Sequence, residues 1–376
     1  MSSEALHLSL LSKLAAGINA DGPAIEVVAD ASSPDGVRVE QLTEQELRGY
    51  EQPLLVVRTS GSTGRAKRTV LSVEAMASSA QATAEYLGFE GQWLLALPVH
   101  YIAGLSVLTR SLFAGTRPVL LPEEGTFTPA GFTQAAESML EKKRLTALVP
   151  TQLARLLDSP SAQTVAVLKR FDAILLGGAR ASRDLLTRAR HHGLRIFQTY
   201  GSSETAGGLV YNGTALPGVK LAVGAEGRVR VTGPMLADGY LGDPAGTAEH
   251  FPLIDGERWY LTDDAGTVRG QRLQISGRLD DVINTGGLKL SAGQLTGHLE
   301  EFFDQVLVVP VPDAQWGQAV GLGYSGPTDT NVAFAAVRQA IGPHAVPKRT
   351  KHYRDGLPML PNGKFDRRKI IEDLSQ

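Results

Sequence analysis

Cysteine is absent from the 376-residue sequence, which excludes disulfides, thiolate catalysis and cysteine-ligated metals. A charge excess of either sign is also missing, because 37 basic residues nearly balance 39 acidic ones. We therefore expect no binding to nucleic acid or to an anionic membrane that is driven by net charge. No run of about 18 apolar residues occurs, and residues 1–20 lack the basic start and apolar core of a signal peptide. These absences favour a cytoplasmic protein.

Short apolar segments alternate with amphipathic helical segments from Leu54 onward. The expected strands are Leu54–Val57, Trp93–Leu97, Pro118–Leu121, Ala147–Val149, Ala173–Leu176 and Arg195–Gln198. The expected helices between them cover residues 73–87, 129–143, 151–158 and 182–192. This alternation predicts an α/β fold with a largely parallel sheet, in which ligands bind beyond the carboxyl ends of the strands.

The pattern changes after Gly207 to short strands punctuated by glycine and proline. Such strands predict a small antiparallel unit that resembles a β-barrel. Near the end of the chain, an apolar segment at Gln305–Val309 and a helical pattern at Val332–Val337 predict a small α+β domain. We expect a large domain over residues 1–279 and a small domain over residues 280–376.

The segment from Thr59 to Lys67 has the composition of a phosphate-binding loop, with two glycines, four hydroxyl side chains and two cations. Glycine lets backbone N–H groups turn toward an anion, the hydroxyls add donors, and the cations neutralise phosphate charge. An ordinary turn rich in serine and glycine has the same composition. The nucleotide-kinase loop is excluded, because Ala66 and Arg68 stand where that motif needs glycine and a hydroxyl residue.

Five further positions carry groups suited to chemistry, and each also has a plainer interpretation. His100 after a strand is more often structural than catalytic, and Gly178 marks either a tight turn or a surface for a flat ring. Glu204 follows serines that suit a helix N-cap, yet its carboxylate also suits Mg²⁺. Asp263 lies in a hairpin turn or accepts from two ribose hydroxyls, and Lys364 lies in a turn that is usually just solvated.

In their order along the chain, the clusters resemble those of the adenylate-forming superfamily of acyl-CoA synthetases, luciferases and peptide-synthetase adenylation domains. The segments that carry the resemblance are Thr59–Lys67, Tyr200–Glu204, Leu261–Gly266, Gly277–Lys289 and Pro361–Lys364. The resemblance covers roughly residues 54–369. It implies an AMP-forming acid–thiol ligase that uses ATP, Mg²⁺ and, as a co-substrate, coenzyme A.

The resemblance implies a role for each segment. The loop Thr59–Lys67 would hold the β- and γ-phosphates of ATP, Glu204 would bind Mg²⁺, and Lys364 would contact the acyl carboxylate and the α-phosphate as the adenylate forms. The nucleotide-binding positions carried over are Thr59, Ser60, Gly61, Ser62, Thr63, Gly64, Lys67, Gly178, Tyr200, Gly201, Ser203, Asp263, Arg278 and Lys289.

Within this nucleotide-binding set, Gly178 and Tyr200 would flank adenine, and Asp263 with Arg278 would hold the ribose. The resemblance further implies that the small C-terminal domain is mobile. It would rotate about a hinge at Asp280, withdraw the catalytic lysine and allow thioester formation.

The acid substrate is suggested by the segment His100–Leu112, which is most similar to menaquinone-pathway ligases that join an aromatic dicarboxylic acid to CoA. Arg110 lies among apolar residues, where an unpaired charge is costly. A second carboxylate on the substrate would pair with its guanidinium. His100 is a further candidate catalytic residue, although the family usually has its histidine one position later, where Tyr101 stands.

Alternatives remain at this point: an aryl-acid adenylation enzyme that loads a carrier protein, and a CoA ligase for another aryl acid. A silent nucleotide-binding protein would have no need to keep Glu204, Asp263, Arg278 and Lys364 together. Arg68 replaces the family's usual glycine, and only 58 residues precede the loop, so we expect a shortened N-terminal region. A second copy covering the surface so exposed would make a homodimer.

Overall fold

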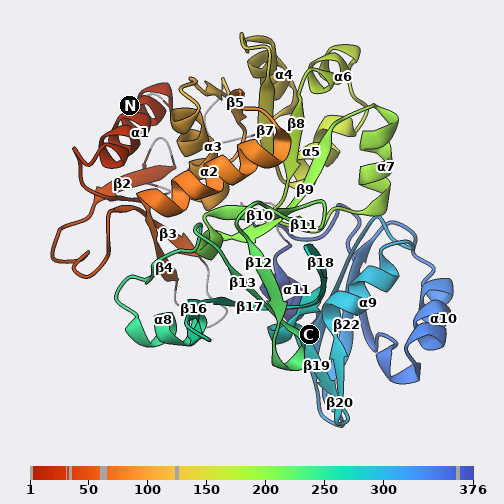
Figure 1. Ribbon diagram of the computed structural model, residues 1–376. Helices are drawn as coiled ribbons and strands as arrows, with labels where there is room; N and C mark the ends of the chain where they lie inside the picture. Colours follow the sequence, from red (N-terminus) through yellow and green to blue (C-terminus); the bar gives the residue numbers. More distant parts are fainter. Residues whose placement is uncertain (1–2, 31, 34–35, 60–65, 123–126, 361–364) are drawn as a thin grey trace. The chain divides into compact units, whose positions relative to one another are not determined.

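The computed structural model describes residues 3–30, 32–33, 36–59, 66–122, 127–360 and 365–376 (Figure 1). The chain forms two compact units. Unit 1 comprises residues 1–221 and 231–261, and unit 2 comprises residues 222–230 and 262–376. The division at residues 279 and 280 that the sequence suggested stays a prediction.

Unit 1 contains a five-stranded sheet in the order β14-β4-β3-β1-β2. Its strands are β1 (Ile25–Ala29), β2 (Val37–Gln41), β3 (Pro53–Thr59), β4 (Lys67–Ser72) and β14 (Gly239–Tyr240). Strands β1 and β3 are parallel, and the other pairs are antiparallel. Because β3 and β4 pair with Thr59 opposite Lys67, the two ends of the expected phosphate loop lie side by side.

The second sheet of unit 1 runs in the order β11-β10-β9-β8-β7-β5-β6. Its strands are β5 (Gln92–Leu95), β6 (Val119–Leu120), β7 (Arg144–Leu148), β8 (Ala173–Leu176), β9 (Ile196–Ser202), β10 (Gly207–Tyr211) and β11 (Thr214–Ala215). The strands from β6 to β9 are parallel, which confirms the α/β fold with a largely parallel sheet. A short hairpin of β15 (Leu253–Ile254) and β16 (Glu257–Arg258) completes the unit.

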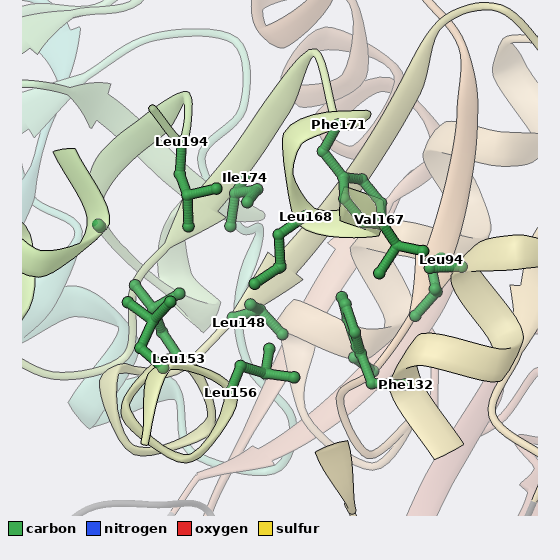
Figure 2. Close-up of a cluster of buried hydrophobic side chains, with 14 of the residues drawn as sticks. Leu94, Phe132, Leu148, Leu153, Leu156, Val167, Leu168, Phe171, Ile174 and Leu194 are labelled. Carbon is green, nitrogen blue, oxygen red and sulfur yellow. The ribbon is translucent and has the colours of Figure 1, made fainter. Parts of the chain in front are cut away.

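Helices cover both faces of this parallel sheet. The helices of unit 1 are α1 (Ser3–Ile18), α2 (Val73–Leu87), α3 (Ile102–Phe113), α4 (Pro129–Glu137), α5 (Pro150–Leu157), α6 (Ala162–Lys169), α7 (Arg183–His191) and α8 (Pro244–His250). Helices α1 and α8 contact strands of the five-stranded sheet instead. One face of the parallel sheet packs on α4 to α7 through a core that includes Phe132, Leu153 and Leu168 (Figure 2). The other face packs on α3, so successive strand residues such as Trp93 and Leu94 are both buried.

Local sequence signals explain where several helices begin and end. The Ser72 hydroxyl accepts from the amide of Ala75 at the start of α2, and Gly88 ends that helix in the left-handed conformation. Helix α4 ends at Glu137, six residues before the end expected from its pattern. The side-chain oxygen of Gln92 accepts from the amides of Leu140 and Glu141, at 2.9 and 3.3 Å, and these bonds replace helical ones.

Unit 2 contains antiparallel strands and one small α+β layer. Its elements are β12 (Lys220–Val223, which begins in unit 1), β13 (Arg228–Thr232, which ends in unit 1), β17 (Tyr260–Arg269, which begins in unit 1), β18 (Arg272–Arg278), β19 (Val282–Thr285), β20 (Leu288–Ser291), β21 (Gln305–Asp313), β22 (Gly317–Ser325), β23 (Arg349–His352), α9 (Ala292–Leu299), α10 (Asn331–Ala340) and α11 (Arg367–Ser375). The order β12-β13-β17-β18 forms one part, and β20-β19-β22-β21, with β23 beside β22, forms the other. Closure of the first part into a barrel stays a prediction.

Two apolar cores lie in the C-terminal α+β layer of unit 2. One contains Val308 and Leu322 with side chains of α9 and α10, and the other contains Val309 with Ile370 and Leu374 of α11. Val308 and Val309 are neighbours in β21 and belong to different cores, as strand alternation requires. This layer has the mixture of helices and strands expected near the end of the chain, and its separation as a small domain stays a prediction. Among the helices described, none is long and apolar enough to cross a membrane.

Candidate active site

Lys67 closes the expected phosphate loop at the start of β4. Its Nζ lies 3.1 Å from Nε2 of His250 and 4.8 Å from the ring centroid of Tyr240. Strand β14 brings Tyr240 there, because Tyr240 pairs with Thr69 two residues beyond the lysine. The loop residues Ser60, Gly61, Ser62, Thr63 and Gly64 lie outside the described residues, so their role stays a prediction.

The guanidinium of Arg68 pairs with the carboxylate of Glu26. Its Nη2 lies 2.6 Å from Oε2 of Glu26, and Nε of Arg58 lies 2.7 Å from Oε1 of the same carboxylate. Glu26 is fully buried. The two arginines come from adjacent strands, so this cluster fixes β3 and β4 just where the phosphate loop begins and ends.

Glu204 lies in a short 3₁₀ helix (Ser203–Thr205) directly after β9, and only 6% of the residue is exposed. The Tyr240 hydroxyl donates to its Oε1 at 3.1 Å, and its backbone carbonyl accepts from the amide of Ala237. Ser202 stands at the N-cap of this helix, as the plainer interpretation expects. Its amide donates to the Thr205 hydroxyl at 3.0 Å, whereas its own hydroxyl makes no cap bond. A single ordered carboxylate suits Mg²⁺, which is commonly held by one or two carboxylates and by substrate phosphates. Among the described residues, no group of three or more metal-binding side chains occurs.

The carboxyl ends of β8 and β9 bring Gly178 and Tyr200 to the same edge of the sheet, because Leu176 pairs with Gln198. Gly178 has a φ of +80°, and Tyr200 is half-buried. A Cβ at Gly201 would collide with the carbonyl of Gly207 on the neighbouring strand. That close approach requires glycine for packing alone, so Gly201 is explained without a nucleotide.

Arg110 lies in the last turn of α3 with 7% of the residue exposed. Its guanidinium carbon is 5.5 Å from the ring centroid of Trp93, which lies in β5. Among the described residues, Nε of Arg110 has no hydrogen-bond acceptor. A small cavity beside it is lined by Trp93, by Leu145, by Glu90 and by side chains of α2 that include Ala80 and Thr83. A buried donor without an acceptor is costly, and a bound anion would satisfy it.

His100 precedes α3 in a turn, and its ring centroid lies 4.1 Å from that of Tyr101. Burial lowers the pKa of His100, so the imidazole is neutral near pH 7. Its Nδ1 has no hydrogen-bond partner among the described residues. The backbone turn here needs Gly104, since a Cβ at that position would collide with the carbonyl of Pro98. The role of His100 stays a prediction.

Within unit 2, Asp263 and Arg278 lie together on paired strands. Nη2 of Arg278 is 3.4 Å from Oδ2 of Asp263, and Nη1 of Arg228 is 3.6 Å from Oδ1 of the same residue. Asp263 lies inside the ten-residue strand β17, so the hairpin-turn interpretation was wrong. Two arginines orient this carboxylate while it remains one-third exposed, as a contact with ribose hydroxyls would require.

Two other candidates of unit 2 have less structural context. Lys289 is exposed on β20, opposite Asn284. Asp280 belongs to a short 3₁₀ helix, and Lys364 lies outside the described residues. Their roles as nucleotide contact, hinge and catalytic lysine stay predictions.

Sequence reasoning missed the residues that hold the candidates in place. His250 and Tyr240 hold Lys67 and Glu204, Trp93 faces Arg110, and Arg228 holds Asp263. In the sequence, Arg228 is marked only by its alternation with valine in an expected strand. No feature of the sequence distinguishes His250.

Residues 10–241 match the family described as AMP-binding enzyme. These residues make up more than half of the chain, and the chain therefore belongs to that family. The adenylate-forming superfamily predicted from the sequence is thus confirmed.

Similar proteins narrow the kind of enzyme within this family. The chain is 36% identical over 366 residues to a probable 2-succinylbenzoate–CoA ligase of Mycobacterium tuberculosis strain H37Rv, covering 93% of this chain and 94% of that protein. It is 30% identical over 390 residues to a probable non-canonical nonribosomal peptide synthetase of Salinispora arenicola, covering 94% of this chain and 5% of that protein. Among solved structures, an o-succinylbenzoate CoA synthetase from Bacillus subtilis in complex with its acyl-adenylate intermediate has a TM-score of 0.71 at 22% identity. That match covers 91% of this chain and 72% of the other, and it shows the shared fold.

Proposed function

We propose that this chain is an AMP-forming ligase that joins o-succinylbenzoate to coenzyme A and requires ATP and Mg²⁺. Family membership and the 36% identity to a probable 2-succinylbenzoate–CoA ligase over nearly the whole of both chains support the reaction class. The observation that carries the substrate is Arg110, a buried guanidinium whose Nε has no acceptor among the described residues.

The chemistry of o-succinylbenzoate gives Arg110 a purpose. The acid has two carboxylates, and only one is activated. The other would bring a negative charge that must be paired if it enters a site lined by apolar side chains. Arg110 beside Trp93 offers a planar cation that binds a carboxylate with two parallel hydrogen bonds. A fatty acid would leave that cation unpaired.

The reaction would proceed in two steps. A carboxylate oxygen attacks the α-phosphorus of ATP, the bond from that phosphorus to the bridging oxygen breaks, and pyrophosphate leaves. The thiol of CoA then attacks the acyl carbonyl, loses its proton, and expels AMP. Mg²⁺ would neutralise charge on the phosphates, and Glu204 is the residue that would hold it.

The other residues would bind and orient the reactants. Lys67 would neutralise the departing phosphates, Tyr200 would support adenine, and Asp263 would accept from the ribose hydroxyls. Lys364 would bring the acid's carboxylate and the α-phosphate together, because two anions approach each other as the adenylate forms. Rotation of the small domain about Asp280 would follow adenylate formation.

Arg110→Leu tests the substrate assignment in a pyrophosphate-exchange assay across aromatic mono- and dicarboxylic acids. We expect the KM for o-succinylbenzoate to rise about 10- to 100-fold, because a charge-assisted hydrogen bond is lost. The KM for a monocarboxylic aromatic acid should change much less. Arg110→Lys should be intermediate, and Arg155→Leu, on the exposed side of α5, serves as the control. An equal rise for both acids, or no rise, would contradict the role of Arg110.

A carrier-protein adenylation enzyme is the second candidate, and the partial match to a nonribosomal peptide synthetase favours it. Both enzymes would make the same adenylate. An assay that offers CoA and a phosphopantetheinyl carrier protein in parallel separates them, and we expect the thioester on CoA. The cytoplasmic location and the homodimer expected from the sequence stay predictions.

A further inference from the structure

The contact between Lys67 and His250 fixes the state of the imidazole. Nδ1 of His250 lies 3.0 Å from the carbonyl oxygen of Gly246, and a carbonyl oxygen only accepts hydrogen bonds. Nδ1 therefore carries the ring hydrogen. Nε2 then has a free lone pair, and it accepts from the ammonium of Lys67 at 3.1 Å.

His250 is held rigidly in this position. It is the last residue of α8, whose first turn is capped by the Asp243 carboxylate accepting from the amide of Gly246 at 2.8 Å. The same helix is tied to β14, because the amide of Tyr240 donates to the Thr247 hydroxyl at 2.8 Å. Since β14 pairs with β4, the imidazole is placed beside the residue that closes the phosphate loop.

Tyr240 contacts both Lys67 and Glu204, the candidate metal ligand. Its ring lies edge-on to that of His250, with centroids 5.6 Å apart, and its face receives the ammonium of Lys67. Its hydroxyl donates to Glu204 at 3.1 Å. Tyr240 is almost completely buried, so one side chain sets the positions of the cation and the carboxylate.

Both partners of Lys67 are uncharged. Among the described residues, the lysine makes no ion pair. A carboxylate partner would also hold the ammonium, but it would cancel much of the charge that attracts phosphate. A neutral imidazole and an aromatic face order the lysine while leaving its whole charge available to an anion.

We propose that His250 is a positioning residue that holds Lys67, fully charged, for the β- and γ-phosphates of ATP and for pyrophosphate. The proposal rests on the proposed function in assigning ATP to this site. The proposal goes beyond that function by giving a role to a residue of α8 that acts through Lys67.

Three substitutions of His250 test the proposal through binding of Mg·ATP and of pyrophosphate, measured by calorimetry without any acid. His250→Leu should weaken both about tenfold, because the hydrogen bond to the ammonium is lost. His250→Gln should recover most of the affinity, because its amide oxygen can accept from Lys67. His250→Glu should bind at least as weakly as the leucine variant, because it cancels the lysine charge. His191→Leu, at the last residue of α7, is the matched control.

A double-mutant cycle with Lys67→Met excludes a general effect on folding. If His250 acts through the lysine, His250→Leu should weaken Mg·ATP binding less than about twofold in the Lys67→Met background. Equal weakening in both backgrounds, or tight binding by His250→Glu, would overturn the proposal. Intact Mg·ATP binding with no activation of o-succinylbenzoate would overturn only the proposed function. No Mg·ATP binding by the unmodified protein would overturn both.

Discussion

Asp238 is a buried carboxylate that the proposed reaction does not use. Burial raises its pKa to about 6, and the nearby charge of Arg258 only partly opposes this. Among the described residues, Oδ2 of Asp238 accepts no hydrogen bond. The nearby Arg258 donates to the backbone carbonyl of Asp238 and not to this oxygen. The folded protein therefore keeps a proton on Asp238 between about pH 4 and pH 6 that the unfolded chain releases. Folding stability from this group is lost as the pH rises through that range.

Asp238→Asn should remove this pH dependence. We expect the variant to gain about 2 kcal/mol in free energy of unfolding relative to the parent protein between pH 4 and pH 7. Urea unfolding at several pH values, followed by tryptophan fluorescence, measures the difference. Asp184→Asn is the control, because that side chain is 77% exposed. A difference that does not vary with pH would show that Asp238 binds protons equally in the folded and unfolded states, and would contradict its raised pKa.

At the residue scale, the sequence indicated the charged residues of the candidate site better than the residues that hold them in place. Arg110 was singled out because its neighbours in sequence are apolar, and it is indeed buried. His250 was missed because its partner Lys67 lies 183 positions away, on a strand that only the fold brings near. The residue pattern of the seven-residue helix α8 does not indicate that contact.

At the scale of elements, the Glu26 cluster joins three adjacent strands. Burial alone would raise the pKa of Glu26, but the hydrogen bonds and charges of Arg58 and Arg68 outweigh it and hold the pKa below its ordinary value. The carboxylate therefore stabilises the fold above its ordinary pKa, and that stability is lost as the pH falls through the lowered value. The cluster anchors both strands that carry the phosphate loop.

Glu26→Gln should destabilise the protein by about 3 kcal/mol at pH 7, because it leaves two cations beside a buried neutral group. The loss should shrink in acid, where the parent carboxylate also becomes neutral. Glu40→Gln is the matched control, because Glu40 lies 4.0 Å from Arg58 and is one-third exposed, and it should cost less than about 1 kcal/mol. Equal losses in urea unfolding for both variants would contradict the importance of burial.

Elements with strong periodicity were predicted well, and those set by distant partners were not. The expected helix at residues 73–87 matches α2, whose cap residues are visible in the sequence. The expected helix at residues 129–143 was too long, because Gln92 from a separate strand takes the backbone amides after Glu137. Strand β17 was partly read as a turn, because its Asp-Asp-Ala-Gly segment has weak strand propensity and pairs only through β18.

At the scale of the whole molecule, the residues assigned to one reaction belong to both compact units. Lys67, Glu204 and Arg110 belong to unit 1, whereas Asp263 and Lys364 belong to the sequence of unit 2. The chain passes between the units three times, so neither unit is a simple terminal segment. The sequence analysis expected Asp263 in the large domain together with Lys67, because periodicity does not indicate which segments return to which unit.

The central claim is tested most directly by identifying the products formed from ATP, CoA and o-succinylbenzoate. Chromatography with mass detection of one reaction mixture follows all of them together. We predict one AMP, one pyrophosphate and one o-succinylbenzoyl-CoA for each ATP consumed, with no thioester when ATP is omitted. Formation of ADP and phosphate, or ATP consumption without a CoA thioester, would contradict the account.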